Sequence, residues 1–318
     1  MLPERVIGRY SGTEKGTLVI CVGGMHGNEP AGVEAMSIMF DMLKVEPEQN
    51  NDFVFKGRLL GLRGNTRALA VGKRFIEKDL NRQWTLHNVT RIKASPIGQL
   101  EHEDLELKEM LQLIEDEIAD YQPEKVVLLD LHTTTAFGGI FSIPTDDPVS
   151  LRLAIELHAP VIKGLLQGVK GTTLQYFNKE NFDLDIVAVC FESGQHLEPL
   201  SVNRAIAAIT NCLRTVGCVQ HEHVENRHDS LLIEHSKGLP QIAELITIHP
   251  IYPGDNFQMA PNYKNFQRVK KGEVLAHDKK GPIIAPEDSL ILMPLYQKQG
   301  DDGFFLVKRL NQRLSIND

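Results

Sequence analysis

Three short apolar runs in the first two thirds of the chain have a similar design. They are GTLVICVGG at residues 16–24, EKVVLLDLHTT at 124–134 and DIVAVCFESG at 185–194. Each is rich in valine, isoleucine and leucine without strict alternation of apolar and polar positions, which is typical of a strand covered on both faces of a parallel sheet. Each run also ends at or just before a histidine or a glutamate.

Segments with apolar residues at helical spacing lie between and around these runs. They cover residues 31–45, 97–121, 148–166 and 198–216. We expect the acidic face of the second segment to point into solvent. Strands alternating with helices predict an α/β fold, here a mixed, mainly parallel sheet with helices on both faces. Ligands of such sheets bind at the carboxyl ends of the strands, where His26, His132 and Glu192 fall.

The pattern changes after Val219. Residues 220–230, QHEHVENRHDS, are polar and typical of a linker. Short β-type runs separated by glycine, proline, aspartate and lysine follow: LLIEHS, ELITIHPIYPGD, QRVKKGEVLAHD, GPIIAP, SLILMPLYQ and GFFLVKRL. The sequence therefore predicts an α/β domain at residues 1–219 and a smaller all-β domain at residues 220–318.

Composition and charge argue against several classes of protein. The chain has 318 residues, a net charge of -8 and a pI of about 5.9, so it lacks the basic field that attracts nucleic acid or an anionic membrane. No apolar run approaches the roughly 18 residues that a spanning helix needs, and the start does not resemble a signal peptide. The four cysteines have no CxxC spacing. We therefore expect a cytoplasmic protein. The sequence does not decide its oligomeric state, and a homo-oligomer is possible.

The polar residues after the runs are those that bind a catalytic metal. A catalytic zinc site takes three ligands from histidine, aspartate, glutamate and cysteine and keeps a fourth position for water. His26 and Glu29, three residues apart among glycines, form a candidate pair, and His132 at the end of its strand is the natural third ligand. Such an ion lowers the pKa of bound water from about 15.7 toward about 7.

Glu192 and Asp130 have candidate roles beside this metal. Glu192 could take the proton of the water and pass it to a leaving amine if its strand lies beside that of His132. Asp130 could orient the imidazole of His132 or make an ordinary buried hydrogen bond. A single histidine is more often a surface or core residue than a ligand, so the prediction depends on all the groups converging.

A basic segment at residues 63–84, RGNTRALAVGKRFIEKDLNRQW, stands out in an acidic chain, and we expect it to be mostly loop. A solvated surface is the simplest interpretation. Alternatively, Asn81 and Arg82 offer neighbouring donors for a carboxylate, and Arg74 could stabilise the oxyanion of a tetrahedral intermediate. Asp79 could hold one of the arginines in place.

Four motifs, in this order along the chain, resemble those of the succinylglutamate desuccinylase/aspartoacylase family, zinc hydrolases related to metallocarboxypeptidases. They are HGNE at 26–29, RFIEKDLNR at 74–82, DLHTTT at 130–135 and FESG at 191–194. The likeness covers most of the chain, and YPGD at 252–255 resembles part of the family's β-rich C-terminal domain. The resemblance implies a zinc carboxypeptidase-like fold and one zinc ion per chain on His26, Glu29 and His132.

The resemblance also implies a reaction and its residues. A small N-acyl amino acid with a free carboxylate would be hydrolysed to a carboxylate and a free amino acid. Glu192 would act as general base and acid, Arg74 would polarise the amide carbonyl, and Asn81 and Arg82 would hold the substrate α-carboxylate.

Three departures from the family pattern affect the substrate more than the metal chemistry. Thr66 stands where the family usually has proline. Aspartoacylases carry an arginine shortly before the catalytic glutamate, but this chain has none between Arg152 and Arg204. Phe304 and Phe305 occupy the late segment that brings a tyrosine into the aspartoacylase site. N-acetylaspartate is therefore not the first substrate that we expect.

Two other functions stay open, while two enzyme classes find no support. The chain contains neither G-x-S-x-G nor the glycine-rich nucleotide motifs. A carboxypeptidase-like zinc peptidase would use the same zinc, glutamate and Asn-Arg pair. A non-catalytic zinc-binding protein acting through its C-terminal β-module is the alternative outside enzymes, although it leaves the desolvation cost of Glu192 unexplained.

Overall fold

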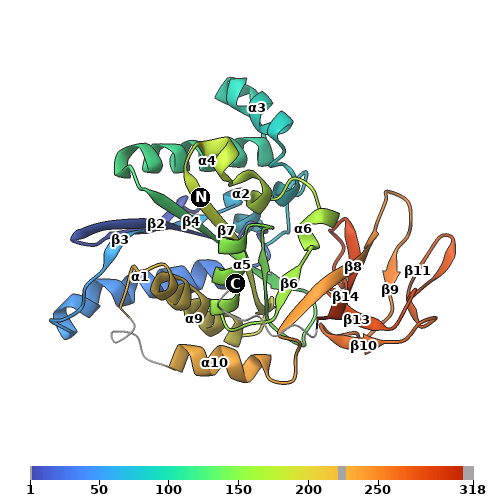
Figure 1. Cartoon of the computed structure of the whole chain (residues 1–318). Coiled ribbons are helices and arrows are strands. Elements are labelled where there is room, and N and C mark those ends of the chain that lie inside the picture. Colours follow the sequence, from blue (N-terminus) through green and yellow to red (C-terminus); the bar gives the residue numbers. More distant parts are fainter. Residues whose placement is uncertain (1, 221–226, 311–318) are drawn as a thin grey trace.

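The computed structural model describes residues 2–220 and 227–310 (Figure 1). Within them, eleven strands form one sheet. Its strands are, in spatial order, β1 (Val6–Ser11), β3 (Lys56–Arg63), β2 (Glu14–Gly23), β4 (Lys125–Thr134), β7 (Asp185–Gln195), β5 (Phe141–Pro144), β6 (Val161–Lys163), β8 (Ile242–Pro250), β14 (Asp302–Arg309), β13 (Ser289–Leu292) and β10 (Gln267–Val269). A second, three-stranded sheet contains β12 (Gly281–Ile284), β11 (Val274–Asp278) and β9 (Gln258–Met259).

The centre of the large sheet is parallel. β3, β2, β4 and β7 run in the same direction, so the three apolar runs of the sequence become the neighbouring strands β2, β4 and β7. β1 and β5 are antiparallel to their neighbours β3 and β7. The predicted mixed α/β fold with a mainly parallel centre is confirmed.

Helices cover both faces of this sheet (Figure 1). One face packs against α1 (Ala31–Gln49), α5 (Pro148–Glu156), α9 (Leu200–Thr215) and α10 (Arg227–Ser236), and the other against α3 (Leu86–Ala94) and α4 (His102–Tyr121). The shorter helices are α2 (Thr66–Val71), α6 (Leu165–Gly168), α7 (Thr173–Tyr176), α8 (Lys179–Phe182) and the 3₁₀ turns Leu80–Arg82 and Ile97–Gln99. Alternate residues of the strands enter the two cores, with Ile20 packed toward α4 and Val19 toward α1.

The acidic face of α4 is only in part the solvent-facing surface that we expected, since Asp116 and Asp120 are exposed but three glutamates are not. Glu103, Glu106 and Glu117 are buried. Glu106 accepts hydrogen bonds from the N–H and the hydroxyl of Thr66, at 3.0 and 2.8 Å. A proline at this position, as is usual in the family, would lack that N–H donor. The helix therefore uses carboxylates to hold the loops that follow β3.

The C-terminal part of the chain differs from the prediction in one element. LLIEHS, expected as a strand, is the end of helix α10, while residues 221–226 of the expected linker lie outside the described residues. From Ile242 onward the described elements are all strands. β8 pairs in parallel with β6 and antiparallel with β14, so this part continues the large sheet. None of the described helices combines the length and the apolar character of a bilayer span.

Candidate metal and substrate site

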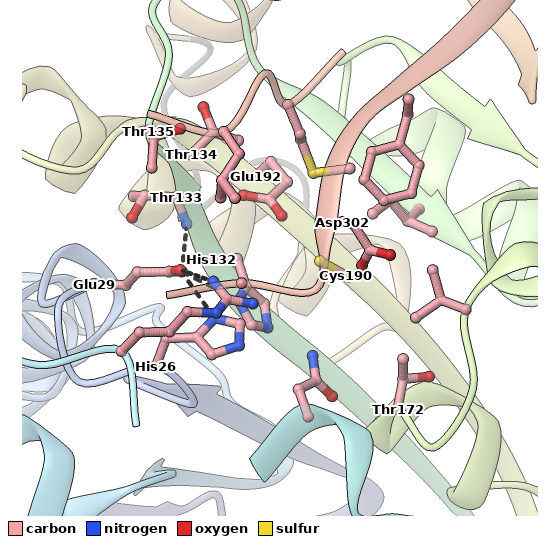
Figure 2. A pocket seen from close by; sticks show the side chains of 18 of the residues that line it. His26, Glu29, His132, Thr133, Thr134, Thr135, Thr172, Cys190, Glu192 and Asp302 are labelled. Atoms are coloured by element: carbon pink, nitrogen blue, oxygen red, sulfur yellow. Dashed lines mark hydrogen bonds and ion pairs between the residues drawn. The ribbon is translucent and has the colours of Figure 1, made fainter. Parts of the chain in front are cut away.

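The site lies at the carboxyl ends of β2, β4 and β7. His26 and Glu29 belong to the turn between β2 and α1. His132 lies on β4 directly opposite Glu192 on β7, in register across two parallel strands. The condition under which Glu192 could act beside His132, that their strands be neighbours, is therefore met. Figure 2 shows His26, Glu29 and His132 pointing toward one another, with Glu192 farther along the same pocket.

The glycines of the turn allow close backbone packing. Gly24 has φ +68°, a conformation that side chains with a Cβ rarely adopt. A Cβ on Gly27 would lie 2.1 Å from the backbone carbon of Ala68 in α2, so only glycine fits there. The N–H of Gly27 donates to the carbonyl of Arg74 at 3.2 Å. The turn that bears His26 is thus joined to the basic segment.

Glu29 is the centre of the cluster. Its Oε1 lies 2.9 Å from Nδ1 of His26, and its Oε2 lies 3.1 Å from Nδ1 of His132. The backbone N–H of Thr133 donates to Oε2 at 2.9 Å. Candidate ligand atoms of the two histidines and Glu29 all lie within 4.8 Å of one another, and the three residues are buried. Among the described residues, no other group of histidine, cysteine or carboxylate side chains meets this condition.

The outer nitrogens of both imidazoles face further carboxylates. Nε2 of His26 is 3.1 Å from Oδ1 of Asp79, and Nε2 of His132 is 3.1 Å from Oδ2 of Asp130. Carboxylates commonly hold metal-binding histidines in this way, because they fix the ring and make the inner nitrogen a stronger ligand. Two imidazoles and one carboxylate are a suitable donor set for zinc, so the residues present fit such an ion.

The charges of the cluster favour a cation. Burial alone would raise the pKa of Glu29, but the charge of His26 and hydrogen bonds from both histidines hold it well below its usual value. Burial would likewise lower the pKa of His132, but the carboxylates of Asp130 and Glu29 raise it well above its usual value. In the protein without a metal ion, a proton on His132 therefore supplies the positive charge that a metal ion would otherwise supply. Metal binding would release that proton.

Glu192 has a different environment from Glu29. It is buried, and its Oε2 has no hydrogen-bond partner among the described residues. Burial, reinforced by the negative charges of Glu29 and Asp130, raises its pKa to about 8, although His132 and Arg74 act in the opposite direction. Two carboxyl groups in one site with opposite pKa shifts are typical of a division into ligand and acid–base roles.

The basic segment divides into site and surface residues. Of its six basic side chains, Arg74 and Arg82 line the pocket. Others act elsewhere: Arg67 pairs with Glu106 at 2.6 Å, and Lys73 is exposed. The segment is only partly loop, since it also contains α2 and a 3₁₀ turn.

Asp79 links Arg74 to His26. Its Oδ2 accepts hydrogen bonds from Nη2 and Nε of Arg74, at 2.8 and 3.1 Å, while its Oδ1 faces His26 and accepts from the N–H of Asn81. Burial opposes its ionisation, but the charges of Arg74 and His26 hold the pKa of Asp79 well below its usual value. Arg74 also lies 3.6 Å from Glu29, so its guanidinium reaches the candidate metal-binding group of His26, Glu29 and His132.

Asn81 and Arg82 lie on the 3₁₀ turn that follows. The side-chain oxygen of Asn81 accepts the N–H of Thr173 at 3.0 Å, which leaves its amide group as a donor. Nη1 of Arg82 donates to the carbonyl of Asn81 at 2.9 Å, and its Nη2 donates to Asp302 of β14 at 2.6 Å. The sequence analysis did not identify Asp302.

A buried carboxylate that the sequence analysis also missed holds the loop between Arg74 and Asp79. Glu103 of α4 accepts the backbone N–H groups of residues 76–78, at 2.7, 3.0 and 3.3 Å, and the side-chain amide of Asn65 at 3.0 Å. An ionised carboxylate that accepts several N–H groups fixes a loop without regular secondary structure.

All seven residues predicted for the site line one pocket: His26, Glu29, Arg74, Asn81, Arg82, His132 and Glu192. The pocket also contains His196, whose Nδ1 lies 2.7 Å from the hydroxyl of Thr133. The position of His196 four residues after Glu192, just past the end of β7, was the available sequence signal. Asp302 had none, because it arrives from a strand far along the chain.

Known proteins resemble the chain in both sequence and fold. Residues 15–216 match the family model of the succinylglutamate desuccinylase/aspartoacylase catalytic domain. A probable aspartoacylase of Nostoc sp. (strain PCC 7120) is 32% identical over 176 residues, which is 54% of this chain and 55% of the relative. The chain spans about half the length of the first curated relatives that it matches.

Solved structures share the fold over nearly the whole chain. Succinylglutamate desuccinylase from Vibrio parahaemolyticus has a TM-score of 0.63 at 20% identity, covering 96% of this chain and 85% of that one. Murine aminoacylase 3 has a TM-score of 0.60 at 18% identity, covering 93% and 95%. At these identities the likeness establishes the fold alone.

Proposed function

The chain belongs to the succinylglutamate desuccinylase/aspartoacylase family, and on that premise we propose that it is a zinc-dependent amidohydrolase of small N-acyl amino acids. The observation that carries the proposal is the convergence of His26, Glu29 and His132 in one pocket with a protonatable Glu192. The products would be a carboxylate and a free amino acid.

Zinc would bind to Nδ1 of His26 and His132 and to a carboxylate oxygen of Glu29, one ion per chain. When bound, it would acidify a water and polarise the substrate carbonyl. Glu192 accepts the proton of the attacking water and then donates it to the leaving nitrogen. Its raised pKa supports this role, because a base that returns its proton works best with a pKa near the working pH.

Arg74 and the pair Asn81–Arg82 would bind the substrate at two points. Arg74 stabilises the negative charge that develops on the amide oxygen, and Asp79 holds its guanidinium in position. Asn81 and Arg82 would donate to the α-carboxylate and so position the amide bond in the pocket that Glu192 lines. The proposed catalytic unit is residues 1–219, and the proposed β-rich C-terminal unit is residues 220–318.

A carboxypeptidase-like peptidase would use the same groups, so the size of the pocket matters. Its volume is about 120 Å³, below the roughly 300–1,000 Å³ of pockets that hold drug-sized ligands. The part of the substrate that the pocket encloses is therefore of about amino-acid size. A panel of N-acetyl, N-succinyl and N-formyl amino acids, run beside short peptides and elemental analysis, tests the proposal. Turnover of peptides alone would favour the peptidase.

Glu192→Ala separates the hydrolase from a non-catalytic zinc protein. We expect the variant to keep about one zinc per chain and to lose about 10²–10⁴ in kcat. His26→Ala should lose the zinc as well. Hydrolysis at the wild-type rate by zinc-loaded Glu192→Ala would rule out the proposed mechanism.

A further inference from the structure

The far end of the pocket differs in chemistry from its metal end. Apolar side chains form much of its wall: Ile143 from β5, Leu165 and Leu166 from α6, Val169 directly after α6, and Phe305 from β14. Among the residues that line this pocket, all within the described part of the chain, there is no tyrosine, so no phenolic hydroxyl is available there. Burial of an aliphatic group against this wall contributes about 25 cal/mol per Å².

Both arginines of the pocket already have a carboxylate partner. Arg74 pairs with Asp79 at 2.8 Å, and Arg82 pairs with Asp302 at 2.6 Å. Among the residues that line this pocket, all of them in the described part of the chain, no other arginine or lysine occurs. One substrate carboxylate can use the remaining donors of Arg82, but a second carboxylate would find no unpaired arginine or lysine among the lining residues.

Acidic side chains make this end of the pocket still less suitable for a second carboxylate. Asp301 and Asp302 both line the pocket, and Asp302 points into it across from the metal cluster in Figure 2. Burial, together with the negative charges of Asp79 and Asp302, raises the pKa of Asp301 above its usual value. Asp301 and Asp302 thus outnumber the single guanidinium of Arg82 at this end of the pocket.

We propose that Asp302 and the apolar wall select N-acyl amino acids with a single carboxylate, in which both the acyl group and the side chain are uncharged and the aliphatic ones are preferred. The inference rests on the proposed function and names the substrate class of the same site. Asp302 acts by charge: its carboxylate excludes a second carboxylate such as those of N-acetylaspartate and N-succinyl amino acids. Specificity of this kind depends on repulsion of the wrong substrate as well as on contacts to the right one.

The experiment compares substrates of equal shape. N-acetylleucine, N-acetylasparagine and N-acetylaspartate have side chains of similar size that differ only in polarity and charge, and N-butanoyl- and N-succinylleucine test the acyl group. For the zinc-loaded wild-type protein we expect kcat/KM to fall from leucine to asparagine to aspartate. The last step should be at least about tenfold, as expected for a like charge a few ångströms away in a partly buried site.

Two variants test the role of Asp302 and of the missing cation. Asp302→Asn should reduce the ratio of asparagine to aspartate kcat/KM by about tenfold. Leu166→Lys, at a half-buried position of the wall, should act in the same direction by supplying a cation. Glu287→Gln removes an equal charge from an exposed position outside the pocket and should leave the ratio unchanged.

The outcomes separate the inference from the proposed function. Hydrolysis of N-acetylaspartate or N-succinylleucine as fast as their uncharged counterparts would overturn the inference and leave the amidohydrolase intact. An unchanged ratio in both Asp302→Asn and Leu166→Lys would overturn the part assigned to charge. Failure to hydrolyse any N-acyl amino acid would instead contradict the proposed function.

Discussion

The two ends of the pocket are built in different ways. At the metal end, His132 and Glu192 lie on adjacent parallel strands, and His26 and Glu29 on the turn that leaves a third. At the substrate end, Arg82 lies on a short turn and meets Asp302 from a strand more than 200 residues later. The metal end therefore depends on the backbone hydrogen bonds of the sheet. The substrate end depends on side-chain contacts between segments that are distant in the sequence.

This difference indicates how the activity should respond to amino-acid substitutions at each end of the pocket. Buried groups with several fixed partners leave uncompensated charge behind when one is removed, so changes at the metal end should abolish function. Contacts between partly exposed side chains cost less to lose, so changes at the substrate end should alter which molecule is bound. The following four predictions test this contrast, beginning with the largest effect.

Arg74 belongs to the metal end through Asp79 and Glu29, so its loss should affect turnover. We expect Arg74→Ala to lower kcat by about 10²–10³ with little change in zinc content. Steady-state kinetics and elemental analysis measure the two quantities. Lys73→Ala, an exposed neighbour, is the matched control and should behave as wild type. Near-normal turnover of Arg74→Ala would show that this arginine does not stabilise the transition state and would assign it to the substrate end.

Arg82 should show the opposite kinetic signature. Arg82→Ala is expected to raise KM about tenfold or more for substrates with a free α-carboxylate, since a charge-assisted hydrogen bond contributes about 1.5–3 kcal/mol. The methyl esters of the same substrates should be much less affected. Equal effects on acids and esters would show that Arg82 does not bind the carboxylate.

Glu103 tests whether the loop between the two ends depends on α4. Glu103→Gln replaces one acceptor oxygen with a donor amide among four N–H groups. We expect a loss of about 1–3 kcal/mol in the free energy of unfolding and a lower kcat/KM with zinc retained. Urea denaturation measures the first quantity. Asp116→Asn, an exposed position on the same helix, should show neither change.

The smallest effect concerns Glu192 in metal-free protein. Its pKa is about 8 in the folded state against 4.5 as the ordinary value. The folded protein therefore binds this proton more tightly than the unfolded chain, so stability falls as the pH rises from about 4.5 to about 8. Between pH 5 and pH 9, metal-free wild type should lose a few degrees more in Tm than Glu192→Gln. Parallel pH profiles of the two proteins would contradict this prediction.

The metal end could be predicted from sequence because each of its groups stands beside a local signal. An apolar run predicts a buried strand, and a histidine or glutamate at its end falls at the ligand-binding edge of a parallel sheet. What the sequence did not reveal is the register that sets His132 opposite Glu192, because register depends on pairing between strands.

Other parts of the structure could not be predicted, because their local sequence carried no signal or a misleading one. The glutamates of α4 have the spacing of a solvent-facing surface, and only their partners on other segments explain their burial. LLIEHS is too short for apolar content to distinguish strand from helix, and it forms the second half of α10 (Arg227–Ser236). Asp302 reaches the pocket only because β14 pairs with β8, and β8 with β6.

The position of β14 has a consequence for biosynthesis. Translation proceeds from the amino terminus, so the segments that carry the proposed zinc ligands and the proposed general base leave the ribosome well before residues 301–305. The proposed metal site is therefore synthesised before Asp302 and Phe305, on which the proposed selectivity partly depends. Because β14 lies between β8 and β13 and brings Phe305 and Val307 into the main core, the large sheet is complete only once β14 has been synthesised.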